Sequence, residues 1–275
     1  MLTVATLTGV VGQPVTHSRS PAMHNAAFRA LGLHWRYLAL PVSPEHVEGT
    51  LRALAPSGYR GVNVTVPHKL AALAVADRAS PAAAEIGAAN TLTFDDGIEA
   101  DNTDAPGLLA ALGASPAGLS AVVLGAGGSA RAAAWALRHA GAAEVSVWNR
   151  TAERADRLAA DLGVRVLARP EAGDLLVNAT SVGLDPAVPE ADALAALGLD
   201  GVEPPPLVVD LVYGAGQTPV GSWAARGGAR VVDGIEVLVQ QGALSFERWT
   251  GIAPPLEVMR SAAREADFSS SRPPN

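Results

Sequence analysis

Short apolar runs alternate with longer amphipathic runs along the whole 275-residue chain. Short β-branched runs bounded by glycine, proline or asparagine are typical of strands, and the longer runs between them are typical of helices. Their regular alternation predicts α/β units with parallel strands. The predicted strands are Thr8–Val11, Trp35–Leu40, Gly61–Val66, Asn90–Phe94, Ile98–Ala100, Ala121–Leu124, Glu144–Trp148, Val164–Leu167, Leu175–Asn178 and Leu207–Leu211.

Capping residues and glycines mark the ends of the predicted helices. Ser20 and Thr218 each precede a proline, which is the order expected for an N-cap followed by the first helical residue. The proline-rich stretch Asp185–Pro206 is expected to be a surface loop, and the polar tail Ser269–Asn275 to be disordered. The predicted helices are 21–31, 130–140, 151–162, a segment that opens at Pro219, 234–250 and 255–266.

Composition narrows the functional classes. The formal net charge of −7 argues against nucleic acid or an anionic membrane as the main partner, because both require a basic face. The absence of cysteine excludes disulfides and thiolate metal sites. No apolar run approaches the roughly 20 residues that span a bilayer, and the N-terminus lacks the basic region of a signal peptide. A soluble, cytoplasmic protein is therefore expected.

The basic residues are unevenly divided between the two types. Of the 20 lysines and arginines, only Lys69 is a lysine. Arginine stays protonated, whereas lysine can release and accept a proton when its surroundings shift its pKa. Lys69 is therefore a candidate acid–base group; the alternative is a surface lysine that survived by chance.

A glycine-rich turn points to a dinucleotide. Gly125-Ala126-Gly127-Gly128-Ser129-Ala130 follows a predicted strand and opens a predicted helix. In a G-x-G-x-x-A turn, the glycines let the backbone approach a pyrophosphate, and the helix N-terminus offers free N–H groups. Glycine-rich turns also occur by chance, so the strand–turn–helix setting carries this prediction. It predicts a Rossmann-type, doubly wound domain around this turn.

The end of the next predicted strand indicates which dinucleotide binds. An NAD site usually places Asp or Glu there to hold the ribose 2′-hydroxyl. This chain has Asn149 and Arg150, then Thr151, then Arg154 one helical turn later. Two guanidiniums can hold the 2′-phosphate of NADP, which a carboxylate would repel, and Thr151 can cap the helix and add a hydroxyl donor. The alternative is a solvated, arginine-rich helix start, but the upstream turn favours NADP.

Polar clusters stand at strand ends in the first part of the chain. Ser20 is explained by helix capping, whereas Ser18 needs no such role and could bind a ligand carboxylate together with Ser20. Asn63 and Thr65 project to the same side of one strand. Any one cluster could be an ordinary turn, but four together favour a ligand site, because ligands of open α/β sheets sit in strand-end loops. The clusters are Ser18–Ser20, Asn63–Lys69, Ala89–Thr91 and Asp101–Asp104.

Taken in order, these segments resemble the shikimate dehydrogenase family. The match runs from Gly12 to about Phe246, and its motifs occur in the family's order, which makes the resemblance specific. Two departures, Ala105-Pro106 and Glu236-Val237, bear on the packing around the nicotinamide. The matching segments are Ser18–Pro21, Asn63–Lys69, Gly87–Thr91, Asn102–Asp104, Gly125–Arg131, Asn149–Arg154, Asn178–Gly183 and Gln241–Ala243.

The resemblance implies a two-domain, NADP-dependent enzyme that reversibly reduces 3-dehydroshikimate to shikimate in aromatic amino-acid biosynthesis. Residues 1–104 would form an α/β substrate-binding and catalytic domain, and residues 105–232 the NADP-binding domain. Residues 233–275 would be helices that return to the substrate domain. A monomer or homodimer without a metal is expected. The alternatives are a quinate/shikimate dehydrogenase that prefers NAD, and a non-catalytic NADP-binding sensor.

The resemblance also implies roles for single residues. Ser18 and Ser20 would bind the substrate carboxylate, and Lys69 would be the acid–base group with Asp104 as its partner. Tyr213 would close on the substrate. The ring hydroxyls would be held by Thr65, Asn90, Asp104 and Gln241, with Asn63 in support. Cofactor contacts are implied for Gly125, Ala126, Gly127, Gly128, Ser129, Ala130, Asn149, Arg150, Thr151, Arg154, Thr180, Leu211 and Gly234.

Overall fold

The computed structural model describes residues 4–171, 173–214 and 216–266, and within them the chain forms two six-stranded sheets with helices. The predicted α/β class is confirmed. The chain divides into two compact units. The first comprises residues up to Thr103 and those from Leu238 onward, and the second comprises Asp104–Val237. The predicted tail Ser269–Asn275 lies outside the described residues.

The first unit is built on a mixed sheet of strand order β2-β1-β3-β5-β6-β4. Its strands are β1 (Thr6–Gly12), β2 (Trp35–Pro41), β3 (Tyr59–Val64), β4 (Arg78–Ala79), β5 (Thr91–Asp95) and β6 (Gly97–Asp101). Its helices are α1 (Ser20–Ala30), α2 (Val47–Leu54), α3 (Lys69–Ala74), α4 (Pro81–Ile86), most of α10 (Gly234–Thr250) and α11 (Leu256–Glu265), with a 3-10 turn at Ala55–Ser57.

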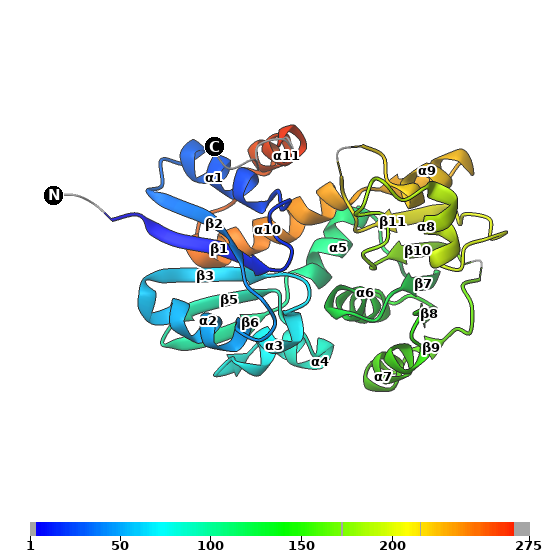
Figure 1. Ribbon diagram of the computed structural model, residues 1–275, viewed down its shortest axis with the longest axis horizontal. Helices are drawn as coiled ribbons and strands as arrows, with labels where there is room; N and C mark the ends of the chain where they lie inside the picture. Colours follow the sequence, from blue (N-terminus) through cyan, green and yellow to red (C-terminus); the bar gives the residue numbers. More distant parts are fainter. Residues whose placement is uncertain (1–3, 172, 215, 267–275) are drawn as a thin grey trace. The chain divides into compact units, whose positions relative to one another are not determined.

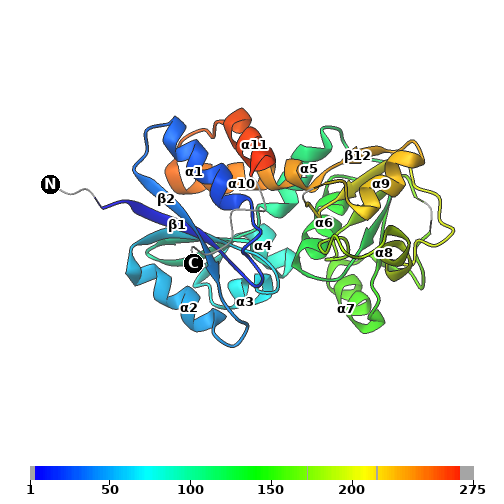
Figure 2. The same ribbon diagram turned by 45° about the horizontal axis from the view of Figure 1, so that its top comes forward.

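Strand direction in this sheet decides which loops share an edge. β1 pairs in parallel with β2 and with β3, whereas β5 is antiparallel to both β3 and β6. The loops after β1, β3 and β6 therefore lie at the same edge as the loop that precedes β5. Helices α1, α10 and α11 cover one face of the sheet, and α2, α3 and α4 cover the other (Figures 1 and 2).

Each face of the first sheet has its own core. Leu51 of α2 and Ala72 of α3 pack with Val11 and Val62 of the strands on one face. The other face is aromatic, and there Phe28 of α1 stacks on Phe246 of α10 with 5.3 Å between ring centroids. The C-terminal helices are thus part of the first unit's core.

The second unit is a parallel, doubly wound sheet of order β12-β11-β10-β7-β8-β9. Its order reverses between β7 and β10, the point at which ligands bind in open α/β sheets. Its strands are β7 (Ser120–Leu124), β8 (Glu144–Trp148), β9 (Arg165–Val166), β10 (Leu175–Asn178), β11 (Leu207–Asp210) and β12 (Arg230–Val232). Its helices are α5 (Asp104–Leu112), α6 (Gly128–His139), α7 (Ala152–Leu162), α8 (Glu190–Ala196) and α9 (Pro219–Arg226).

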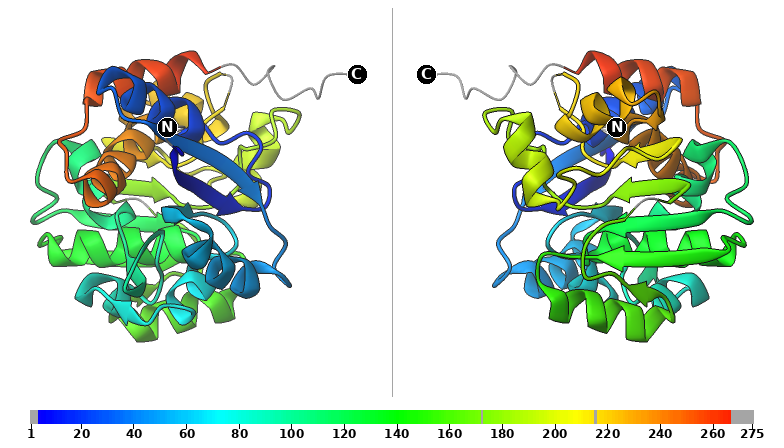
Figure 3. Two further views of the ribbon diagram at one scale, coloured as in Figure 1. Left: turned by 90° about the vertical axis from the view of Figure 1, so that its left-hand side faces the viewer. Right: turned by 90° about the vertical axis from the view of Figure 1, so that its right-hand side faces the viewer.

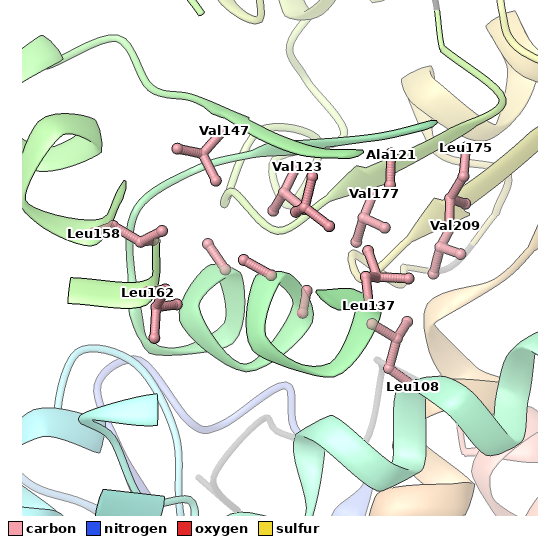
Figure 4. Packing of buried hydrophobic residues seen from close by; sticks show 14 of the residues in the cluster. Leu108, Ala121, Val123, Leu137, Val147, Leu158, Leu162, Leu175, Val177 and Val209 are labelled. Carbon is pink, nitrogen blue, oxygen red and sulfur yellow. The ribbon is translucent and has the colours of Figure 1, made fainter. Parts of the chain in front are cut away.

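Successive side chains of each strand point to opposite faces of the second sheet, so the core of this unit has two parts. Val123 of β7 and Val177 of β10 lie over α6, which carries Leu137, and Leu158 of α7 lies below Val147 of β8 (Figure 4). The alternate strand residues pack instead against α8 and α9, on the opposite face (Figures 1 and 3). A sheet buried on both faces requires the continuous apolar runs seen in its strands.

Several local predictions are wrong. β3 ends at Val64, so Thr65 lies in the turn after the strand and does not share a strand face with Asn63 as predicted. The N-cap of α1 is Arg19 rather than Ser20, and Ser20 is the first helical residue. The predicted surface loop Asp185–Pro206 contains α8, because Ala193 and Leu197 recur at helical spacing and are buried. Thr151 is the N-cap of α7, but its side chain makes no capping hydrogen bond.

Candidate active site

Two turns interlock at the carboxyl edge of the first sheet. Gln13 N donates to Val66 O at 3.0 Å, and Thr65 N donates to Val11 O at 2.8 Å. A Cβ on Gly12 would lie 2.3 Å from Thr65 Cγ2, so only glycine permits this approach. The turn that leads to Ser18 and the turn that leads to Lys69 are therefore held side by side.

Lys69 is buried, with 7% of its surface exposed, and it is the first residue of α3. Its carbonyl accepts from Ala89 N at 2.9 Å, next to Asn90, and Val64 N donates to Asn90 O at 2.8 Å. The chain's single lysine thus lies inside the edge where the polar clusters gather. A surface lysine retained by chance is excluded.

The loop after β1 is anchored by a residue that the sequence analysis missed. Arg19 is buried, and its Nη1 donates to the carbonyls of Ala263 at 2.7 Å and Arg264 at 3.2 Å, at the end of α11. Ser18 Oγ accepts from Ser20 N at 3.3 Å. The expectation that Ser18 has no part in starting the helix is therefore wrong, because its hydroxyl accepts from the first helical N–H.

Asn63 is the centre of a buried polar network behind this edge. Its Oδ1 accepts from Tyr37 Oη at 2.8 Å. Its Nδ2 lies within donating distance of Thr91 Oγ1 at 3.0 Å, Ser245 Oγ at 2.8 Å and Asn90 O at 3.2 Å. Every one of these partners belongs to the first unit.

Asn90 and Gln241 are linked directly. Asn90 Nδ2 donates to Gln241 Oε1 at 3.1 Å and to Thr103 Oγ1 at 3.0 Å, and Asn90 Oδ1 accepts from Thr103 N at 2.7 Å. Gln241 Nε2 donates to Leu238 O at 2.8 Å. Two amides predicted to hold ring hydroxyls are thus brought together and oriented by the fold.

Three hydroxyls complete the network. The Oγ atoms of Thr91, Thr103 and Ser245 lie 2.9, 3.1 and 3.2 Å from one another. Thr91 and Thr103 lie in two of the predicted polar clusters, although neither was given a role of its own. Ser245 was missed, although it follows Gln241 by one helical turn. A search for polar positions at helical spacing around Gln241 would have found Ser245.

Tyr37 is itself held by an unusual neighbour. His24 stacks on its ring at 4.2 Å between centroids and 4° between planes. Neither ring nitrogen of His24 has a hydrogen-bond partner among the described residues. Burial lowers the pKa of His24 to about 3, which keeps the imidazole neutral beside the network.

The predicted dinucleotide turn joins β7 to α6 in the second unit. Gly125 has φ +114° and donates from its N to Trp148 O at 2.7 Å. Gly127 is the extended N-cap of α6, and no side chain caps this helix. A Cβ on Gly127 would have open space around it, so the turn offers bare backbone and a helix N-terminus. These groups fit a phosphate.

The end of β8 presents two unpaired cations. Arg150 and Arg154 are exposed, and neither guanidinium has a hydrogen-bond or ion-pair partner in the described part of the chain. Asn149 Nδ2 donates to Thr151 O at 2.8 Å, which shapes the turn between them. By contrast, Arg131 and Arg165 of the same unit are paired with carboxylates. The arrangement fits an anionic group such as a 2′-phosphate.

The remaining predicted residues also lie at strand ends. Thr180 follows β10, Leu211 and Tyr213 follow β11, and all three are half-buried. Asp104, also half-buried, begins α5 directly after Thr103. In the described residues, no group of three or more His, Cys, Asp or Glu side chains could hold a metal, and no helix there is long and apolar enough to cross a membrane.

Family models match three parts of the chain. Residues 10–92 match the shikimate dehydrogenase substrate binding domain, residues 111–181 match shikimate / quinate 5-dehydrogenase, and residues 234–264 match the shikimate 5'-dehydrogenase C-terminal domain. Shikimate dehydrogenase (NADP(+)) of Methanopyrus kandleri is 44% identical, with 94% of each chain covered. The chain belongs to the shikimate dehydrogenase family.

Further members of the family agree in length and fold. Shikimate dehydrogenase (NADP(+)) of Moorella thermoacetica is 43% identical over 100% of this chain and 99% of its own. Shikimate 5-dehydrogenase from Thermus thermophilus, solved with NADP(H) and shikimate, has a TM-score of 0.81 and 43% identity over 94% of this chain and 98% of its own. The predicted family and two-domain fold are confirmed.

Proposed function

We propose that this member of the shikimate dehydrogenase family is an oxidoreductase that reversibly reduces 3-dehydroshikimate to shikimate with NADPH. The observation that carries the proposal is the burial of Lys69, the chain's only lysine, at the edge that also holds Asn63, Asn90 and Gln241. A lysine in such a setting can exchange a proton, and the amides can pair with hydroxyl groups.

The substrate side of the proposal assigns its groups by chemistry. Ser18 and Ser20 would bind the carboxylate, for which hydroxyl donors suffice when the loop is fixed as Arg19 fixes it. The ring hydroxyls would pair with Thr65, Asn90, Asp104 and Gln241, and Asn63 would support them. Tyr213 would close on the substrate. A site built of fixed hydrogen-bonding groups discriminates strongly against analogues that lack the matching hydroxyl.

The protein must move one proton for each turnover. Bound NADPH supplies the hydride that reaches the ketone carbon. The Lys69 ammonium would donate a proton to the ketone oxygen in the same direction, and the neutral amine would take it back in the reverse direction. Asp104 would be its carboxylate partner.

The cofactor side divides between backbone and side chains. The Gly125–Ala130 turn and the N-terminus of α6 would hold the pyrophosphate. Asn149, Thr151 and the guanidiniums of Arg150 and Arg154 would hold the 2′-phosphate. Thr180, Leu211 and Gly234 would line the nicotinamide side. A cytoplasmic monomer or homodimer remains our prediction, and sedimentation of the purified protein tests the oligomeric state.

An absorbance assay at the NADPH band tests the function. Purified protein is given shikimate with NADP⁺, and quinate with NAD⁺ as the control pair. We expect fast reduction of NADP⁺ with shikimate and little with the control pair. Activity confined to NAD⁺ would favour the quinate/shikimate alternative, and NADP⁺ binding without turnover of either substrate would favour the sensor.

A further inference from the structure

Asp210 ends β11 with its carboxylate buried in the second unit. Its Oδ1 accepts from Asn178 Nδ2 at 2.8 Å and from Val212 N at 3.1 Å, and its Oδ2 accepts from Thr218 Oγ1 at 2.5 Å. No cationic side chain is among its partners in the described residues. Burial raises its pKa to about 6, so the charge is held at a cost in stability.

The first hydrogen bond leads to the dinucleotide turn. Asn178 Oδ1 accepts from Thr180 N at 3.2 Å and from Thr180 Oγ1 at 2.8 Å. A Cβ on Gly125 would lie 3.3 Å from Thr180 Cγ2 and 3.0 Å from Ala179 O. The turn after β10 therefore lies against the glycine turn, and Asp210 holds it there through Asn178.

The second hydrogen bond leads to the segment that carries Tyr213. Val212 N is fixed by Asp210, and Tyr213 is the next residue. A Cβ on Gly234 would lie 2.6 Å from Leu211 O and 2.8 Å from Val212 O, so the start of α10 packs directly on this segment. Asp210 thus also fixes the backbone on which Leu211 and Gly234 meet.

The third hydrogen bond serves a different purpose. Thr218 is the N-cap of α9, and its Oγ1 accepts from Gly221 N at 3.1 Å. This bond supports the start of α9 and does not involve Thr180, Leu211 or Gly234. It therefore provides a matched control for the other two.

We propose that Asp210 is a positioning residue for the cofactor side of the site, holding Thr180 through Asn178 and the Leu211–Tyr213 segment through the Val212 N–H. An ionised carboxylate suits this role because it only accepts hydrogen bonds and can take donors on both oxygens. The inference rests on the proposed function, in which Thr180, Leu211 and Gly234 line the nicotinamide side.

The test compares three variants by NADP⁺ dissociation constant from titration calorimetry and by melting temperature. Asp210→Ala removes all three acceptor contacts. It should raise the NADP⁺ dissociation constant about tenfold or more, because a small displacement of binding groups lowers affinity strongly. Asp210→Asn keeps one acceptor oxygen for Asn178 and Val212 and should stay within about threefold of wild type. Thr218→Val should lower the melting temperature yet leave NADP⁺ binding within about threefold.

The outcomes distinguish failure of the positioning role of Asp210 from failure of the proposed function. Failure of the wild-type protein to bind NADP⁺ would overturn the proposed function itself. Wild-type binding with an unaffected Asp210→Ala, or an equal loss in Thr218→Val, would overturn only the positioning role of Asp210. If Asp210→Ala does not fold, Asn178→Ala replaces it. This variant cuts the link from Asp210 to Thr180, leaves the bond from Val212 N to Asp210 in place, and should also weaken NADP⁺ binding about tenfold.

Discussion

The two sheets carry their polar groups in different ways. At the edge of the first sheet, Asn63, Asn90, Thr103 and Gln241 are buried and hydrogen-bond to one another. At the edge of the second, a glycine turn leaves backbone N–H groups uncapped, and exposed guanidiniums stand nearby. Ring hydroxyls need donors and acceptors fixed in direction, whereas phosphates need charge and N–H groups. Damage to the buried amides of the first edge should therefore affect folding as well as chemistry, and damage to the exposed guanidiniums of the second should affect binding alone.

Lys69→Ala should give the largest effect. Loss of a positioned acid–base group is expected to lower kcat about 10²- to 10⁴-fold. The NADP⁺ dissociation constant, measured by calorimetry, should not change, because the second unit is untouched. Lys69→Arg keeps the charge but cannot exchange the proton, so it should be similarly slow. An active arginine variant would show that Lys69 acts only as a charge.

Asn63→Ala tests whether the first edge is structural as well as functional. Its removal takes one hydrogen-bond partner from each of the buried Tyr37 Oη, Thr91 Oγ1 and Ser245 Oγ, which should lower the free energy of unfolding by about 3 kcal/mol. Asn149→Ala, at the second edge, should cost less than about 1 kcal/mol. Urea unfolding followed by tryptophan fluorescence measures both. Equal losses would remove the contrast between the edges.

Arg150→Ala sharpens the contrast from the other side. Removing one charge-assisted contact to the 2′-phosphate should raise the dissociation constant for NADP⁺ about tenfold. The dissociation constant for NAD⁺ and the melting temperature should not change. Arg169 is also exposed, and Arg169→Ala is the matched control. The 2′-phosphate assignment is wrong if NAD⁺ binding weakens equally.

His24 should make the first unit sensitive to acid. Its pKa of about 3 in the folded protein lies below its ordinary value of 6.5, so unfolding takes up a proton between these values. The contribution of His24 to the free energy of unfolding is therefore present above pH 6.5. Below pH 6.5 it falls by about 1.4 kcal/mol per pH unit. Urea unfolding at pH 6.5 and 5.5 should show that His24→Leu lacks this loss and that His34→Gln, at an exposed position, retains it.

Asp210 contributes a pH dependence of the free energy of unfolding that is opposite in sign to that of His24. The experiment must therefore distinguish the two contributions. Because burial raises the pKa of Asp210 to about 6, its contribution favours folding at low pH and is lost as the pH rises through 6. The difference between wild type and His24→Leu therefore isolates the histidine, since Asp210 is common to both. A constant difference across the two pH values would contradict the buried, neutral state of His24.

Much of the fold could be predicted because its signals are local. Apolar runs located five of the six strands of the parallel sheet but not the short β12, and Thr218-Pro219 marked the start of α9 correctly. The start of α1 was misplaced by one residue, because a serine before a proline has the same pattern whether it is the N-cap or the first helical residue. Helix α8 was hidden by the prolines around it, and its buried face depends on Val220 and Trp223, which are distant in sequence.

In the candidate site, too, residues with a local sequence signal could be predicted, and residues whose role depends on distant partners could not. Lys69 could be singled out by its rarity, and the Gly125 turn by its spacing. Tyr37 and Asp210 could not, because their roles arise from partners brought together by tertiary structure. A hydroxyl or carboxylate in an apolar run has no sequence signature that distinguishes a network member from an isolated polar residue.

The first unit is discontinuous in sequence, since the chain leaves it after Thr103 and re-enters it at Leu238. Ser245 and Trp249 supply hydrogen-bond partners for strands from the beginning of the chain, and Phe246 packs on Phe28 of α1. During synthesis, the inserted unit can complete its sheet while the earlier unit still lacks those partners. The ribosome must therefore release nearly the whole chain before the lysine-bearing half can mature, whereas a fragment with only the inserted segment contains all of its own strands.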